Sequence, residues 1–419
     1  MGRYRFRRAH LGTLAGALTL AVCARVGVEA AVERAPASPA SRPSAPSPSS
    51  PSSSPTGSPG SSPDGSGPSP APSASIGKAE GTLQVLTFQG HVEYGGATSS
   101  ADWVSPFEKL TGCRISRLDR VRTSEEMADK LRGASYDVVS PSPDLAGRLV
   151  AEGEVVPLDT GLLQFYKDIP RRLRESPATR GGDGEGRVYG VPFLWGVNQV
   201  MYEGAEPEGP DALYRTERAA IRNTPLGIAD AALALRETQP ALGIKDPFQL
   251  TAAQLDAAEK LLAEKNGPQR IYWQSSLDVI QAFATGEVRL AQALPYHLDL
   301  FRRAGRPVKE MKAKAMTGWV DSWMVGADAP SPNCAYKWLN WVSSADTQRA
   351  AAAWTGLAPA NQKACDGDAR RLCEIYHVRD DRWLRRVLFA VRPTKDCGGL
   401  GGECTDYPEW EKGWKSLVK

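Results

Sequence analysis

The hydrophobic pattern between residues 82 and 150 alternates between two periods. Runs in which apolar positions recur at every second residue predict β-strands at 83–88, 113–115 and 136–140. Segments with helical spacing follow them at 102–111, 123–131 and from Asp144 onward. Strands that alternate with helices predict a parallel α/β sheet. Ligands of such sheets bind beyond the carboxyl ends of the strands, where the connecting loops lie.

The remaining chain is richer in helical patterns. Helices are predicted at 228–237 and at 251–265, the second with an N-terminal cap at Thr251. A third helix is predicted to begin at Ser331-Pro332-Asn333, and its apolar face consists of Ala335, Trp338, Leu339 and Val342. The folded part is predicted to span 79–419, and roughly 340 residues exceed one ordinary core, so we expect two lobes. The expected ranges are 82–190 plus 290–325 for the first lobe, and 191–289 plus 326–419 for the second.

Residues 1–30 have the layout of a signal peptide. Four arginines precede an apolar run over 11–24, which is too short for a comfortable membrane span. Val28-Glu29-Ala30 fits ordinary cleavage, whereas Leu20-Ala21-Val22-Cys23 resembles a lipobox in which Cys23 would carry lipid. The sequence leaves both routes open. We therefore expect an extracytoplasmic protein, either periplasmic or secreted, or lipid-anchored to the outer face of the cell membrane.

Residues 31–78 are predicted to form a disordered tether. The stretch 36–77 consists mostly of Pro, Ser, Ala and Gly and contains no aromatic residue. Such a composition buries too little apolar surface to offset its ordering entropy, and the prolines favour an extended chain. About forty residues of polyproline-like chain would span roughly 120 Å. This length is typical of a spacer between a membrane or cell wall and a folded domain.

The cysteine count indicates disulfides. Six of the seven cysteines lie after Cys23, and an even number in an exported domain is typical of a disulfide framework. Cys397 and Cys404 bracket the glycine-rich loop 398–402, so we expect this pair to be bonded. The other four, Cys113, Cys334, Cys365 and Cys373, allow three pairings, which the sequence leaves open. A zinc site is a weak alternative, since only His377 lies near a cysteine, Cys373.

Charge and motifs exclude several function classes. Residues 1–78 hold eight Lys/Arg against three Asp/Glu, whereas the whole chain has a net charge of +3, so residues 79–419 are slightly acidic. Nucleic-acid binding therefore lacks an electrostatic basis. No His-Glu-x-x-His and no Gly-x-Ser-x-Gly motif occurs. We predict no catalytic residue, no metal site and no cofactor.

The segment 317–323 carries the strongest chemical signal. It places Asp321 between the indoles of Trp319 and Trp323. Indole faces attract an organic cation, and a carboxylate supplies its counter-charge. The structural alternative is that both tryptophans belong to the core and that Asp321 caps a turn. We interpret the segment as a ligand site for a small cation, with Trp323 more suited to packing.

Six short segments together resemble a known family. They are 107–113, 123–127, 136–142, 189–196, 319–322 and 358–361. Their order and spacing are similar to those of the extracellular solute-binding proteins of ABC importers, specifically the spermidine/putrescine-binding receptors. The resemblance covers nearly all of residues 82–419.

The resemblance implies a two-lobed periplasmic-binding-protein-like fold of the class II type. Each lobe would be a sheet flanked by helices, with hinge strands near 189–195 and a ligand cleft that closes on binding. By the same resemblance Asp321 pairs with an ammonium group, Trp319 stacks on the ligand, and Ser142 hydrogen-bonds to it. Tyr296 lies where the family places an aromatic residue.

Two departures from the family bear on the ligand. The first strand leads into Phe88–Glu93 instead of an aromatic pair, so His91 and Glu93 become the candidate contacts there. A second acid expected before the Ala-rich helix is missing, and 223–226 reads Asn-Thr-Pro-Leu. Losing one charge-assisted hydrogen bond costs roughly 1.5–3 kcal/mol. A monocation, a zwitterion, an opine-like solute or a different polyamine therefore stays open beside spermidine and putrescine.

We therefore expect a non-enzymatic, monomeric receptor that delivers a small cationic solute to the membrane permease and ATPase of an ABC importer. The permease and ATPase are implied by the resemblance alone. Two alternatives stay open: a secreted hydrolase that uses carboxylates, and a tethered surface scaffold that has lost its ligand.

Overall fold

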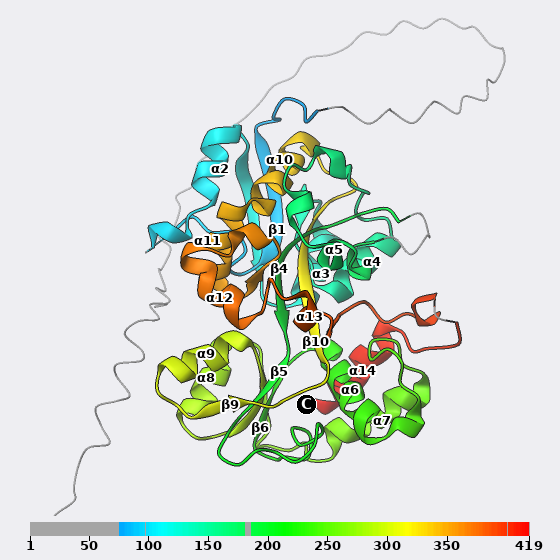
Figure 1. Cartoon of the computed structure of the whole chain (residues 1–419). Helices are drawn as coiled ribbons and strands as arrows, with labels where there is room; N and C mark the ends of the chain where they lie inside the picture. Colours follow the sequence, from blue (N-terminus) through cyan, green and yellow to red (C-terminus); the bar gives the residue numbers. More distant parts are fainter. Residues whose placement is uncertain (1–74, 97, 181–185, 400, 419) are drawn as a thin grey trace, which may run out of the picture. The chain divides into compact units, whose positions relative to one another are not determined.

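The structure, a computed structural model, describes residues 75–96, 98–180, 186–399 and 401–418. The predicted signal peptide, Cys23 and most of the predicted tether lie outside the described residues. Residues 72–419 form one compact unit. Within it the described residues form two β-sheets, each flanked by helices (Figure 1). No helix in these ranges combines the length and the apolar character needed to cross a bilayer.

The first sheet has seven strands. They are β1 (Thr82–Phe88), β2 (Arg114–Val121), β3 (Val138–Val139), β4 (Val191–Val197), β10 (Met316–Val325), β11 (Ala358–Pro359) and β12 (Val387–Phe389). The order is β11-β4-β10-β3-β1-β2, and β12 pairs with β10. β1 pairs in parallel with both β2 and β3, which confirms the predicted parallel α/β core. The long strand β10 runs antiparallel to β3 and β4.

The second sheet has five strands in the order β7-β6-β8-β5-β9. They are β5 (Gln199–Glu203), β6 (Ala219–Arg222), β7 (Ile271–Trp273), β8 (Leu290–Ala293) and β9 (Val308–Glu310). β6 is parallel to β7 and β8, so the residues that follow these three strands lie at one edge of the sheet.

Thirteen α-helices lie in the described ranges. Those associated with the first sheet are α2 (Val104–Thr111), α3 (Ser124–Gly133), α4 (Pro143–Ala151), α5 (Arg171–Arg174), α10 (Pro332–Ser343), α11 (Ala345–Thr355), α12 (Arg370–Ile375) and α13 (Asp381–Leu384). Those associated with the second are α6 (Ile228–Thr238), α7 (Ala252–Ala263), α8 (Ser276–Ala284), α9 (Pro295–Arg303) and α14 (Tyr407–Leu417).

The predicted helix ends are confirmed where local signals marked them. The Thr123 hydroxyl accepts a hydrogen bond from the Glu126 N–H at the start of α3, and Thr251 forms a capping box with Gln254 at the start of α7. Gly112 adopts the left-handed conformation with φ 72° after α2, a conformation that costs glycine little.

The two sheets divide the chain differently from the expected lobe ranges in three places. Residues 191–197, expected in the second lobe, form β4 of the first sheet, while residues 290–310, expected in the first lobe, form β8, α9 and β9 of the second. Residues 332–355, expected in the second lobe, form α10 and α11, which pack in the first hydrophobic core with Trp338 and Leu339 fully buried. The helical face of α10 was predicted, but which sheet it covers depends on tertiary packing.

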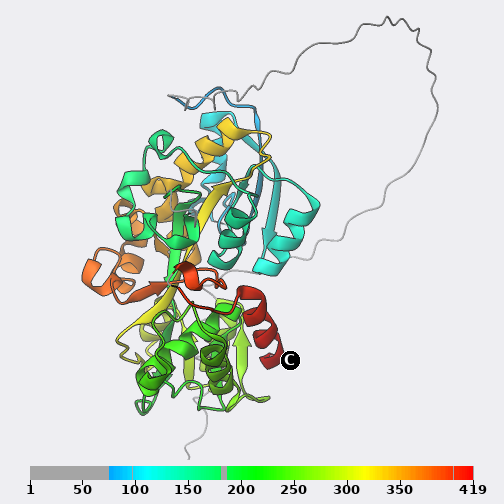
Figure 2. The same ribbon diagram turned by 90° about the vertical axis from the view of Figure 1, so that its right-hand side faces the viewer.

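The chain passes between the two sheets three times. β4 continues into β5 through Asn198, so the first crossing lies just beyond the 189–195 segment expected near the hinge. The second crossing is 311–315, which leads from β9 into β10. The third is 390–406, which leads to α14 beside α7 (Figure 2). The Asn198 N–H donates to the Thr317 carbonyl at 2.9 Å, which ties the first two crossings together.

The described residues contain three disulfides: Cys113–Cys334, Cys365–Cys373 and Cys397–Cys404. The predicted Cys397–Cys404 bond is therefore present. The zinc alternative is wrong, because Cys373 is bonded to Cys365 and no thiolate remains among these six residues.

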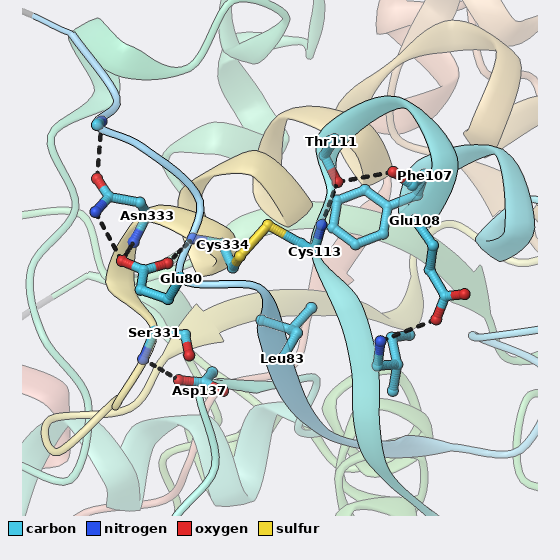
Figure 3. The surroundings of a disulfide bond; sticks show 12 residues. Glu80, Leu83, Phe107, Glu108, Thr111, Cys113, Asp137, Ser331, Asn333 and Cys334 are labelled. Atoms are coloured by element: carbon cyan, nitrogen blue, oxygen red, sulfur yellow. Dashed lines mark hydrogen bonds between the residues drawn. A yellow bond between two sulfur atoms is a disulfide. The ribbon is translucent and has the colours of Figure 1, made fainter.

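The Cys113–Cys334 bond joins the start of β2 to the start of α10 (Figure 3). Beside it the Glu80 carboxylate accepts hydrogen bonds from the backbone N–H groups of Asn333 and Cys334 at 2.9 and 2.8 Å. The Gly77 N–H donates to the Asn333 side chain at 2.8 Å. The folded chain therefore starts by Gly77, slightly before the expected end of the tether at residue 78.

Candidate functional site

The predicted site residues Trp319 and Asp321 lie on β10, where the strand passes the junction of the two sheets. Trp319 pairs with Gly196 of β4 and Asp321 pairs with Leu194. The pairing then skips Phe193, so β4 carries one extra residue at this point. Such bulges redirect side chains and are frequent beside functional sites. Trp323, beyond the bulge, is fully buried against Phe193 and Trp338, as expected for a packing residue.

Asp321 is a buried carboxylate with few polar partners. It is 5% exposed, and its Oδ2 lies 3.6 Å from the His91 Nε2. Burial raises the pKa of Asp321 to about 7, against the opposing effects of the Arg222 charge and a side-chain hydrogen bond from Trp319. Burial lowers the pKa of His91 to about 4, so this imidazole is neutral at pH 7. No Lys or Arg of the described ranges lies within ion-pair distance of Asp321.

Ser140, His91 and Asp321 follow one another as in a nucleophilic triad. The His91 Nδ1 lies 3.4 Å from the Ser140 Oγ, and Nε2 faces Asp321. Ser140 is fully buried, however, and His91 packs edge-on against Phe193. A nucleophile must reach its substrate, so this arrangement serves to hold His91 against Asp321.

The face of Trp319 is covered by Arg222 of the second sheet. The guanidinium carbon lies 3.8 Å from the centroid of the indole ring, a close cation–π contact. Arg222 is the last residue of β6, so it lies at the carboxyl edge of that sheet. The sequence predicts a ligand cation at this indole face, whereas in the structure Arg222 lies there.

The other predicted contacts differ in where they lie. The Ser142 hydroxyl donates to Asp144 Oδ1 at 2.6 Å at the start of α4, next to the Ser124 hydroxyl. The Glu93 carboxylate lies 3.7 Å from the Arg120 guanidinium, and no contact joins it to Asp321. The predicted contacts are therefore not all brought together around Asp321.

The Tyr296 ring lies at the junction of the two lobes and is partly buried against both hydrophobic cores. A Cβ added to Gly356, the residue after α11, would lie 2.8 Å from this ring. The Tyr376 hydroxyl donates to the Gly356 carbonyl at 3.0 Å, which fixes the backbone beneath Tyr296.

Two further acids surround Arg222. Asp144 follows Ser142 on α4 and is buried, and its charge raises the pKa of Asp321. Asp230 lies in the first turn of α6, within the Ala-rich helix before which the second acid was sought. Burial raises the pKa of Asp230 to about 7, while hydrogen bonds from Thr317, Gln292 and Asn198 oppose that rise.

The sequence analysis missed Arg222, Asp144 and Asp230 as site residues. The signal for Arg222 is its place after the apolar run Ala219-Ala220-Ile221, the same strand-end position that selected Ser142.

Comparison with known proteins places the chain in a family. A family model described as bacterial extracellular solute-binding protein matches residues 102–370. The chain belongs to this family. A spermidine/putrescine-binding periplasmic protein of Salmonella typhimurium strain LT2 is 24% identical over 268 residues, which cover 62% of this chain and 73% of that protein.

Solved structures agree on the fold. The spermidine/putrescine ABC transporter substrate-binding protein PotD of Streptococcus pneumoniae aligns with a TM-score of 0.60 at 14% identity, over 81% of this chain and 99% of that one. A structure described as a GABA receptor aligns with a TM-score of 0.59 at 18% identity, over 81% and 98%. The fold is the two-lobed periplasmic-binding-protein-like fold, and the chain is a substrate-binding protein of an ABC transporter.

Proposed function

We propose that this substrate-binding protein captures a small organic cation, a polyamine or a related amine, outside the cytoplasm. The observation that carries the proposal is the state of Asp321. It is a buried acid beside an indole, and no Lys or Arg of the described residues pairs with it. A buried carboxylate without a cationic partner is costly, and an ammonium group from a ligand would remove that cost.

The environment of Asp321 favours a ligand over a structural role. His91 contacts it in the neutral form, and Trp319 supplies one hydrogen bond, so much of its acceptor capacity is unused. An acid kept only for stability would have a cationic or multiple hydrogen-bonding partner, as Asp119 has in Lys130, Arg117 and Tyr136.

The identity of the amine rests on weaker support. The spermidine/putrescine-binding relatives are distant, at 24% identity. A fold neighbour is described as a GABA receptor, and GABA also carries an ammonium group. An ammonium group is therefore the shared chemistry of the proposed ligand, and spermidine and putrescine are the first candidates.

The proposed mechanism is capture without turnover. A ligand bound to Asp321 that also contacts the second lobe would favour the closed arrangement of the lobes. The closed, monomeric protein would then dock on the permease, which a cytoplasmic ATPase drives. Export through the signal peptide, with or without lipid on Cys23, belongs to the same proposal.

Titration calorimetry tests the proposal on the mature protein. The panel contains spermidine, putrescine, agmatine and 4-aminobutyrate. At least one amine is expected to bind with saturable heat and without product formation. Asp321→Asn, which keeps the shape but removes the charge, should weaken that binding at least about tenfold. The matched control is Asp346→Asn, because the Asp346 side chain is 91% exposed on α11.

Three other results of the calorimetry would contradict the proposal. Unchanged affinity in Asp321→Asn removes this residue from the site. Release of product from a panel compound supports the hydrolase, and no heat with any compound supports a scaffold without ligand.

A further inference from the structure

The second group that a ligand would meet in this site is a cation, not an acid. Arg222 closes over Trp319 from the second lobe, at the edge of the sheet where strands β6 and β7 end. Resting on the proposed function of Asp321, we infer that the ligand also carries an anionic group, a carboxylate, which Arg222 binds. The ligand would then be a zwitterion that joins Asp321 of the first sheet to Arg222 of the second.

The Arg222 guanidinium has no polar partner in the described parts of the chain. Its contacts are the indole of Trp319 at 3.8 Å and, further away, the ring of Trp273 at 5.9 Å. The hydrogen bond that Arg222 makes with the Gln292 side chain uses its backbone N–H. Five guanidinium N–H donors are therefore available at the junction of the lobes.

The acids around Arg222 are not its structural counter-ions. The pKa of Arg222 responds to the charges of Asp321, Asp230 and Asp144, so all three lie near it, yet none forms an ion pair with it. Asp230 accepts hydrogen bonds from Asn198 and Thr317.

Asp144 is likewise occupied, because it accepts hydrogen bonds from Ser142 and Ser124. Asp321 and Arg222 thus remain as the two charged groups of this site with unused hydrogen-bonding capacity.

Burial makes an unpartnered guanidinium unfavourable, which is why the pKa of Arg222 is lowered from its ordinary value. The indole face compensates for part of the lost hydration, because the ring quadrupole attracts the desolvated cation. A planar carboxylate would satisfy two donors at once in a bidentate pair, the geometry for which arginine is suited. Lysine at this position would supply the positive charge but not the two parallel N–H donors of a guanidinium.

A polyamine meets the opposite electrostatics. One ammonium group would pair with Asp321, but the next would approach Arg222 and be repelled by it. The missing acid of the second lobe is thus replaced by a residue of opposite charge. Because Arg222 already covers the indole face of Trp319, this face is not free for a ligand cation.

Matched pairs of probes test the inference by calorimetry on the mature protein. Each pair keeps the amine and changes the other end: 4-aminobutyrate against putrescine, and arginine against its decarboxylated form, agmatine. In the wild-type protein the carboxylate member of at least one pair is expected to bind about tenfold more tightly than its partner or better. Arg222→Met should remove that preference, and Arg222→Lys should restore only part of it.

Two variants keep the outcome interpretable. Arg114→Met is the matched control, because Arg114 is an exposed arginine of β2 and should leave the preference unchanged. Arg222→Glu replaces the cation by an acid and should reverse the preference toward putrescine or agmatine. Near- and far-ultraviolet circular dichroism of each variant checks that the fold is kept.

The possible failures are distinct. If putrescine or agmatine binds the wild-type protein as tightly as its carboxylate partner, with binding lost in Asp321→Asn, the inference is overturned and the proposed function stands. If Arg222→Met keeps the preference, the inference is overturned as well. If no member of either pair binds, both the inference and the proposed function fail.

Discussion

The indole ring of Trp319 lies directly on the backbone of Gly196, its partner on β4. A Cβ added to Gly196 would lie 2.4 Å from two ring carbons of Trp319, closer than side chains can approach. Only glycine leaves room for the ring, and the ring in turn supports Arg222 and hydrogen-bonds Asp321. The positions of Asp321 and Arg222 therefore depend on the absence of a Cβ at residue 196.

Gly196→Ala should displace the Trp319 ring and weaken amine binding by about tenfold or more, because the ring no longer supports either charge. Calorimetry with the tightest amine of the panel measures the loss. Gly133→Ala is the control, since a Cβ there meets nothing within 4 Å. Equal affinities in the two variants would contradict the role given to the indole.

Affinity for the amine should fall as the pH is lowered from 8 to 6. The pKa of Asp321 in the ligand-free protein is about 7 because the residue is buried, and only the ionised form attracts an ammonium group. The ionised fraction therefore falls about tenfold between pH 8 and pH 6, and the dissociation constant should rise by about the same factor. His91 stays neutral over this range, since its pKa is about 4.

Asp321→Asn should abolish that pH dependence along with most of the affinity.

The raised pKa of Asp321 also predicts how the stability of the ligand-free protein changes with pH. Between about pH 4 and pH 7 the folded protein binds more protons at Asp321 than the unfolded chain, so the free energy of unfolding falls as the pH rises. A ligand-free Asp321→Asn protein that is less stable than the wild type at pH 7.5 would contradict this assignment.

An ion pair between the lobes should bias the protein toward closure. Arg371 of α12 reaches Asp299 of α9, and its Nε lies 2.8 Å from each carboxylate oxygen. The pair is partly exposed, so its loss in Arg371→Ala should weaken amine binding by at most about fivefold. Small-angle scattering of the ligand-free variant should show a larger radius of gyration.

The control for that pair lies on the same helix. Arg370 is bonded to Glu374 within α12 at 3.3 Å and spans no junction. Arg370→Ala should leave affinity and scattering unchanged, and a matching loss in both variants would argue for a general effect of α12.

The three disulfides should differ in their contribution to stability. Cys113–Cys334 spans 221 residues, whereas Cys397–Cys404 spans 7. By loop-closure entropy, replacing the first pair by serine should cost about 5 kcal/mol and replacing the second about 2 kcal/mol. Denaturant unfolding measures both losses, and a larger loss for the short loop would rule out the entropic account here.

Local signals predicted much of the fold. The caps at Thr123 and Thr251 and the glycine-rich loop closed by Cys397 and Cys404 act over a few residues, so the sequence displays them directly. Cys113–Cys334 could not be predicted, because its partners meet only after α10 packs beside α2 and β1. The core in which α10 packs differs from its expected lobe for the same reason, since an apolar face indicates burial but not the partner.

The candidate site shows the same limit. The pairing of Asp321 with Trp319 is visible in the sequence, because both lie on one strand. The contact between Trp319 and Arg222 joins residues of different sheets, and no spacing along the chain indicates it. Whether Asp321, Trp319, Ser142, Tyr296, His91 and Glu93 bind a ligand stays a prediction.

The clasp formed by Glu80, Asn333 and the Cys113–Cys334 bond has a mechanical consequence. It fastens the beginning of the folded chain to the first lobe and includes neither Asn198 nor 311–315, the first two chain crossings. A force that enters through the N-terminal residues is therefore absorbed by a cross-linked helix and strand. The chain crossings about which the second lobe would turn, Asn198 and 311–315, lie outside this clasp.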